Sequence, residues 1–209
     1  MIGLNGIVKG DFEMKLNLMK LFDGYVRNYH TFNLTIHHGK HSFTMTEIEY
    51  FSKLGSMLGY SPFTEDTCNG KNRAMDLTWW DNGDETGWND FILHLERENY
   101  FSKDEETLDK LFCERDAIPE HVIGIMNVRS IDRVQELLNQ ATQMCKIKDA
   151  LLIFRTNSTG KNQLYFDEVH AYHLQYNKKL KMEKKIAYVS DIAGTLFMHY
   201  ENEKKAISR

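Results

Sequence analysis

The chain has 209 residues, of which 42% are hydrophobic and 27% are charged. This length and balance are typical of a single globular domain over residues 1–209, and they exclude an intrinsically disordered chain. The formal net charge of −4 argues against a dedicated nucleic-acid-binding module, because phosphate contacts need Lys and Arg. It does not exclude an enzyme whose acidic metal site lies beside a local basic patch.

The cysteines and the apolar segments predict where the protein resides. Cys68, Cys113 and Cys145 are far apart and odd in number, which favours reduced thiols in a cytoplasmic protein. Charge precedes any long apolar run at the N-terminus, and no apolar stretch approaches ~20 residues, so we expect neither a signal peptide nor a membrane partner.

The N-terminal segment, residues 1–43, is expected to contain a helix followed by an extended segment. Apolar residues at helical intervals predict an amphipathic helix over 11–30. Residues 31–43 alternate apolar and polar side chains before Gly39, which indicates a short strand or an extended loop.

A second helix is predicted over residues 44–58, where apolar side chains share one face. Thr44 and Glu47 have the spacing of a capping box. Gly59 follows the last apolar position and is expected to end the helix.

The middle of the chain alternates strands with helices. The expected elements are a polar loop over 60–74, strands over 75–80 and 90–98 joined by a turn, a helix over 103–112, a strand over 121–127, a helix over 131–145, and strands over 150–155 and 164–174. Residues 186–200 fit a helix or a strand. This alternation predicts an α/β fold with a mixed sheet and helices on both faces.

Two of the predicted strands carry acidic residues that alternation places on one face. Successive side chains point to opposite sides of a strand, so Glu96 and Glu98 share a face with His94. If the two strands pair, Asp76 and Glu96 come close together. Two such carboxylates repel unless a divalent cation binds, and Mg²⁺ prefers a few carboxylates together with water and phosphate oxygens.

The order of these segments resembles the core of the PD-(D/E)XK nuclease superfamily. The resemblance covers about residues 44–112 and rests on EIEYFSKLGSMLGY, RAMDLTWWD, FILHLERENYF and DEETLDKLF. It implies a restriction-endonuclease-like fold, a mixed central sheet flanked by helices, with a nuclease-like core over 44–176 and a C-terminal segment over 177–209.

The resemblance also implies an activity and a set of site residues. It predicts a metal-dependent nuclease that hydrolyses DNA phosphodiesters, with Asp76 and Glu96 as ligands of Mg²⁺ or Mn²⁺. Glu98 and the helix residue Glu47 would support catalysis. A bound ion of this kind polarises the phosphate and activates the attacking water.

One position departs from the family pattern. The family usually has Lys two residues after the acid of the second strand, and this chain has Glu98 there. Lys103 and Lys110, on the following segment, are the candidates to replace that lysine. Arg73, just before the Asp76 strand, is a candidate phosphate contact.

Several of these residues have a structural interpretation beside the functional one. Glu47 fits a capping box as well as a site acid, and His94 either touches the site or packs beside it. Trp80 either stacks on a base or packs against its neighbours. The histidines within 37–41 are expected in an exposed loop, and the lysines within 178–185 either contact phosphates or form a solvated face.

A second hypothesis is a catalytically inactive protein that keeps the nuclease fold as a binding or assembly module. The missing motif lysine and the acidic net charge favour it, and fold alone does not determine function. A homodimer is compatible with this hypothesis. A third hypothesis is an enzyme that acts on small molecules or nucleotides on the same scaffold.

Overall fold

A computed structural model describes residues 16–66, 74–81, 91–113, 118–145, 149–157, 167–177 and 179–203 of the chain. The helices are α1 (Leu18–Asn28), η1 (Tyr29–Phe32), α2 (Lys40–Met57), α3 (Asp104–Phe112), α4 (Ile131–Met144) and η2 (Glu201–Glu203). The strands are β1 (Ser61–Asp66), β2 (Met75–Trp80), β3 (Phe91–Glu98), β4 (His121–Val128), β5 (Asp149–Asn157), β6 (Asp167–Asn177), β7 (Lys179–Ile192) and β8 (Thr195–Tyr200).

The strands form one mixed sheet in which each strand lies beside its neighbour in sequence, in the order β1 to β8. The pairs from β1 to β3 and from β5 to β8 are antiparallel, and β3, β4 and β5 are parallel. Parallel neighbours need a crossover connection. Helices α3 and α4 provide the two crossovers here.

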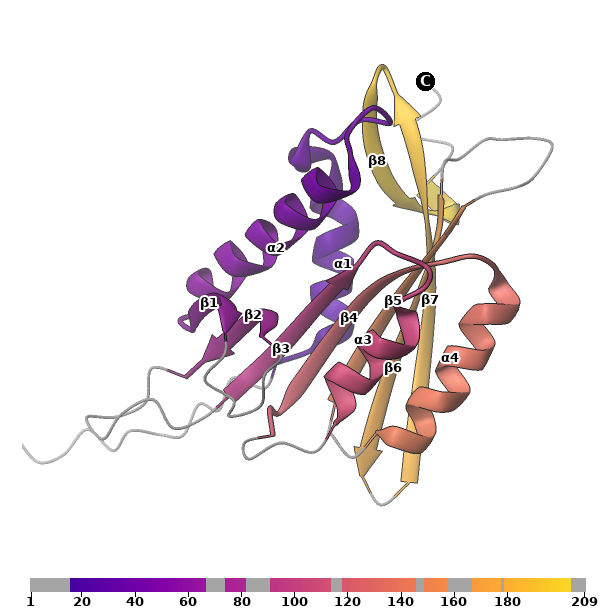
Figure 1. The fold of residues 1–209 in the computed structure, drawn as a ribbon. Coiled ribbons are helices and arrows are strands. Elements are labelled where there is room, and N and C mark those ends of the chain that lie inside the picture. The colour runs from indigo at the N-terminus through magenta and orange to yellow at the C-terminus, as the bar shows by residue number, and fades with distance from the viewer. Residues whose placement is uncertain are drawn as a thin grey trace, which may run out of the picture.

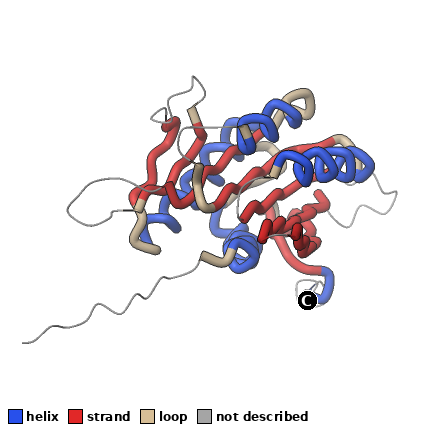
Figure 2. Tube along the Cα trace, turned by 90° about the horizontal axis from the view of Figure 1, so that it is seen from below, coloured by secondary structure: helices blue, strands red, loops and turns tan. Residues whose placement is uncertain are grey.

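The helices cover both faces of the sheet, with α1 and α2 on one and α3 and α4 on the other (Figures 1 and 2). We call these the α1–α2 face and the α3–α4 face. Each face holds its own buried apolar cluster, as alternation along β5 illustrates: Leu151 and Ile153 belong to the first cluster, and Leu152 and Phe154 to the second. Strands covered on both sides are nearly continuously apolar for this reason.

The predicted α/β class, with a mixed sheet and helices on both faces, is confirmed. The predicted strand over 75–80 matches β2, and those over 121–127 and 150–155 lie within β4 and β5. Of the ambiguous residues 186–200, 186–192 belong to β7 and 195–200 to β8. None of the described helices is long and apolar enough to cross a membrane.

Two expectations for the N-terminal half are wrong. Residues expected to form a polar loop include β1, Ser61–Asp66, whose residues before Asp66 are exposed or partly exposed and therefore lack an apolar signal. Helix α2 begins at Lys40 with Gly39 at its N-cap, so Thr44 lies inside the helix and makes no capping box. The Thr44 hydroxyl instead donates to the Lys40 carbonyl oxygen, at 3.3 Å.

The end of α2 is as expected. Gly59 adopts φ of 91°, a left-handed conformation that glycine takes without a Cβ penalty. The turn expected after β2, from residue 82 on, and Arg73 lie outside the described residues.

Candidate functional site

The structure brings Asp76 and Glu96 together on adjacent strands. Leu77 of β2 pairs with Leu95 of β3, so the antiparallel ladder places the two acids opposite each other on the α3–α4 face. The backbone N–H of Asp76 donates to Glu96 Oε1 at 3.0 Å, and the backbone N–H of Arg97 donates to Asp76 Oδ2 at 2.7 Å. Each carboxylate therefore links β2 to β3.

Helix α3 adds a lysine to this pair. Lys110 Nζ lies 2.6 Å from Glu96 Oε1, and both side chains are largely buried. Lys103 is exposed at the N-cap of α3. Of the two lysines that follow the acidic strand, Lys110 is therefore the one that reaches the acids.

Burial and mutual repulsion change the acidity of both carboxyl groups. Burial, followed by the charge of Asp76, raises the pKa of Glu96 to about 7, against the opposing effect of Lys110. Burial also raises the pKa of Asp76, and the charge of Glu98 adds to this. Such perturbed carboxyl groups are typical of functional sites, although structural ion pairs produce them too.

Each carboxylate of the pair has one oxygen that is available to bind a metal ion. Asp76 Oδ1 and Glu96 Oε2 accept no hydrogen bond from the described residues. Within the described residues, no group of three or more His, Cys, Asp or Glu is placed to hold a metal ion. Two carboxylates with water are nevertheless a common protein contribution to Mg²⁺ binding, so this donor set fits a hydrated divalent cation.

Glu98 lies near the pair but has a local partner. Its Oε1 accepts a hydrogen bond from the backbone N–H of Tyr100 at 2.6 Å, which stabilises the turn after β3. Its charge reaches the site, because it contributes to the raised pKa of Asp76.

The structure does not bring Glu47 to the site. Glu47 lies on the α1–α2 face, across the sheet, where its carboxylate pairs with Arg97 Nε and with Arg155 at 2.9 Å. Tyr25 donates to it at 2.6 Å, and Arg155 also pairs with Asp167 at 2.7 Å. Burial alone would raise the pKa of Glu47, but Arg97 and Arg155 outweigh it and lower that pKa.

We call these four residues, Glu47, Arg97, Arg155 and Asp167, the buried ion network. All four are 5% exposed or less, and their two positive and two negative charges balance. The sequence analysis did not identify this network. The available signal was an arginine at the end of each of two apolar strand segments, FILHLER and ALLIFR, since unpaired charges are rarely buried.

The other candidate residues have packing partners. His94 is buried on the α3–α4 face with its ring 5.0 Å from that of Phe91. Trp80 Nε1 donates to Asp66 Oδ2 at 2.8 Å, and its ring lies 3.9 Å from that of Phe91. His38 accepts a hydrogen bond from the backbone N–H of Thr35 in an exposed loop, as expected. His41 lies instead in the first turn of α2.

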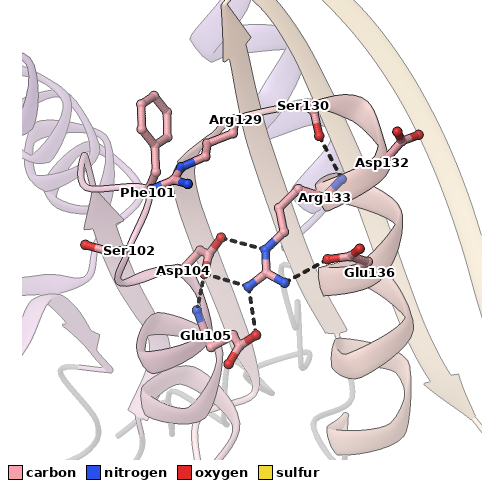
Figure 3. Close-up of a pocket in the computed structure, with 9 residues that line it drawn as sticks. All are labelled: Phe101, Ser102, Asp104, Glu105, Arg129, Ser130, Asp132, Arg133 and Glu136. Atoms are coloured by element: carbon pink, nitrogen blue, oxygen red, sulfur yellow. Dashed lines mark hydrogen bonds and ion pairs between the residues drawn. The ribbon is translucent and has the colours of Figure 1, made fainter.

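An open pocket of about 530 Å³ lies elsewhere, between the N-terminal ends of α3 and α4 (Figure 3). It is lined by none of the predicted site residues. Arg133 occupies its centre and pairs with Asp104, Glu105 and Glu136 at 2.8–2.9 Å. These acidic partners thus neutralise the charge of Arg133, and its ion pairs with Asp104 and Glu105 link α4 to α3.

The fold and the acid pair define an α/β protein with an eight-stranded mixed sheet and a two-carboxylate candidate site. No family model and no curated protein matches the chain. Among solved structures, the chain is similar to the central domain of yeast acetyl-CoA carboxylase, with 10% identity and a TM-score of 0.38. The similarity covers 71% of this chain and 25% of the carboxylase chain, so this chain spans about a quarter of the length of that structure. A likeness at this level carries no argument about function.

Proposed function

We propose that the chain is a metal-dependent nuclease with a divergent restriction-endonuclease-like fold, which hydrolyses DNA phosphodiesters at Asp76 and Glu96. The observation that carries the proposal is the convergence of these two carboxylates with Lys110, whose Nζ is 2.6 Å from Glu96. Two acids and a lysine are the residue types expected from the family pattern. Here the lysine comes from α3 instead of the acidic strand.

The order of elements supports the same proposal. Helix α2 precedes the antiparallel strands β1 to β3, and α3 then leads to β4, which is parallel to β3. This agrees with the helix, Asp-bearing strand, acidic strand and helix on which the resemblance rests. Glu47 departs from the proposal because it lies on the other face of the sheet.

Each residue has a distinct part in the proposed reaction. Asp76 Oδ1 and Glu96 Oε2 would hold a hydrated Mg²⁺ or Mn²⁺ ion, which supplies Lewis-acid polarisation of the phosphate and a more acidic bound water. The Lys110 ammonium would donate a hydrogen bond to the attacking water or to a phosphate oxygen. The oxygen of the attacking water would bond to phosphorus and release a proton to solvent, while the P–O bond to the leaving oxygen breaks and that oxygen takes up a proton from solvent.

A second candidate function, a binding or assembly module, is favoured by a different aspect of the same geometry. Asp76 and Glu96 already accept backbone N–H groups across the ladder, and Lys110 neutralises one charge. This arrangement stabilises the sheet without a metal ion. It is consistent with a nuclease-like fold that has lost its activity.

A cleavage assay separates the two candidates. The purified chain is incubated with plasmid and single-stranded DNA in Mg²⁺, Mn²⁺ or chelator, beside Asp76→Asn, Glu96→Gln and Lys110→Met. The nuclease proposal predicts metal-dependent cutting that each variant reduces at least 100-fold, since each removes a metal ligand or the adjacent cation. Glu106→Gln, an exposed acid on α3, is the matched control and should cut normally.

Metal binding provides the second readout. Calorimetry with Mn²⁺ should detect binding to the unmodified chain and to the Glu106→Gln control, and none to the Asp76→Asn variant. Circular dichroism checks that all variants fold. Absence of both cutting and Mn²⁺ binding in the folded, unmodified chain would reject the nuclease and leave the binding module.

A further inference from the structure

Half of β7 lies at an open border of the sheet. β7 pairs with β6 from Lys179 to Val189, whereas β8 pairs only with residues 187–192 of β7. Residues 179–186, which we call the β7 edge segment, therefore have no strand on their outer side within the described parts of the chain. Figure 1 shows this half of β7 running along the border of the sheet, away from β8.

An open edge presents a row of backbone N–H and C=O groups that another strand can pair with. The segment is long enough for such pairing, because ordinary strands have about 5–6 residues. Its side chains are also accessible: residues 179–184 are all exposed, and the next two are partly exposed.

The two faces of the β7 edge segment differ in chemistry. On the α3–α4 face, Leu180 and Met182 are 38% and 54% exposed, and Leu180 pairs with Tyr176, which is 50% exposed. These side chains extend the apolar cluster that contains Leu174, the partner of Met182. If a strand were added here, every second side chain of that strand would cover this apolar surface.

The opposite face is basic. Lys179 and Lys181 point to the α1–α2 side, as their neighbour Lys185 does in its ion pair with Asp23. Lys184, on the other face, lies over the ring of Tyr172 at 5.2 Å. Glu183 is the single acid among residues 179–186, so the segment has a net positive charge although the whole chain is acidic.

We propose that the β7 edge segment binds an extended acidic peptide segment of another protein by strand addition. Backbone pairing would supply affinity, and alternate side chains would supply specificity. The fitting partner alternates apolar residues, over Leu180 and Met182, with acidic residues beside Lys179 and Lys181. A second copy of this chain fits poorly, because it would bring two lysine-rich edges together.

A peptide titration tests this inference independently of any nuclease activity. The probe is a fluorescein-labelled ten-residue peptide that alternates Val and Glu, and binding is followed by fluorescence anisotropy. We expect saturable binding that Lys179→Glu/Lys181→Glu weakens at least tenfold. Lys20→Glu/Lys53→Glu makes the same change in charge at exposed helical positions and should leave the affinity within twofold of the original.

A second peptide separates strand addition from simple charge attraction. A peptide that alternates Pro and Glu has the same charge but lacks half of the N–H donors of a strand, and it should bind at least tenfold more weakly. Hydrogen exchange should slow within residues 179–186 when the Val–Glu peptide is added. Leu180→Ser/Met182→Ser, which keeps the charges, should also reduce the affinity.

Three results would overturn the proposal. Equal binding of the two peptides would indicate non-specific electrostatics. No binding of either would mean that the lysines only protect the edge from pairing, as edge lysines often do. A dimer in sedimentation experiments that Lys179→Glu/Lys181→Glu dissociates would identify a second copy as the occupant.

Discussion

Arg155 is a charged side chain enclosed by the sheet and by aromatic rings. It is 4% exposed, pairs with Glu47 and Asp167, and lies about 5.5 Å from the ring of Tyr29. Charges in such a place are tolerated only when they are paired and hydrogen-bonded. Removing one partner of a buried pair leaves the other charge uncompensated, which costs more than the pair itself contributes.

We therefore expect Arg155→Met to lower the free energy of unfolding by about 3–5 kcal/mol, mainly because Asp167 loses its partner. Urea unfolding followed by tryptophan fluorescence measures this loss. Lys53→Met is the control, since it breaks an exposed pair with Glu49, and such pairs contribute at most about 1 kcal/mol. A loss below 1 kcal/mol for Arg155→Met would show that the network does not stabilise the fold electrostatically.

At the scale of elements, a glycine sets how closely α2 approaches the sheet. A Cβ added to Gly55 would lie 2.6 Å from Nε1 and 2.7 Å from Cε2 of Trp79, a fully buried side chain. Tyr60 stacks on the same indole, with 5.7 Å between ring centroids. The indole is fully buried and stacked on Tyr60, so it cannot move away from an added Cβ without disturbing this packing.

Gly55→Ala should therefore destabilise the protein by about 1–3 kcal/mol through overpacking, although alanine favours a helix over glycine by about 1 kcal/mol. The thermal unfolding midpoint measures the change, and near-ultraviolet circular dichroism reports on the environment of Trp79. Gly24→Ala, also inside a helix, is the matched control, because the added Cβ there would meet only the Tyr50 hydroxyl, at 3.3 Å. Equal stability of the two variants would contradict the close contact.

At the scale of the whole molecule, buried histidines predict how stability depends on pH. Burial, with a contribution from Lys184, lowers the pKa of His170 to about 4. Glu168 lies 3.3 Å from Nε2, but its side chain is one-third exposed, so water weakens its effect. Burial also lowers the pKa of His173, against the opposing effect of Asp149.

The direction in which the free energy of unfolding changes with pH follows from comparing the folded and unfolded chains. Unfolded histidine binds a proton near pH 6.5, whereas folded His170 binds one only near pH 4, so acid favours the unfolded state between these values. His170 by itself should therefore lower the free energy of unfolding by up to about 1.4 kcal/mol for each unit that the pH drops across this window. Protonation of Glu96, whose pKa is raised to about 7, acts in the opposite sense. His170→Phe should flatten that slope in urea titrations at several pH values, and substitution of the exposed His37 should not. An unchanged slope in His170→Phe would contradict the lowered pKa.

The sequence predicted well those elements whose apolar pattern is strong. β2 and α4 carry apolar residues at regular intervals, whereas β4 and β5 are nearly continuous apolar runs, because both of their faces are buried. β1 was missed because its residues before Asp66 are exposed or partly exposed. The start of α2 was placed four residues late, since Lys40, His41 and Ser42 are polar and the helix has no side-chain cap.

Alternation along a strand is a local property, so the sequence by itself determined that Glu96 and Glu98 share one face of their strand, and it indicated the α/β class. Only the tertiary structure decided that Lys110 approaches Glu96 and that Glu47 lies across the sheet with Arg97 and Arg155. These contacts depend on which face each helix covers and on the register between strands. Both arise from packing among residues far apart in the chain, which no local period encodes.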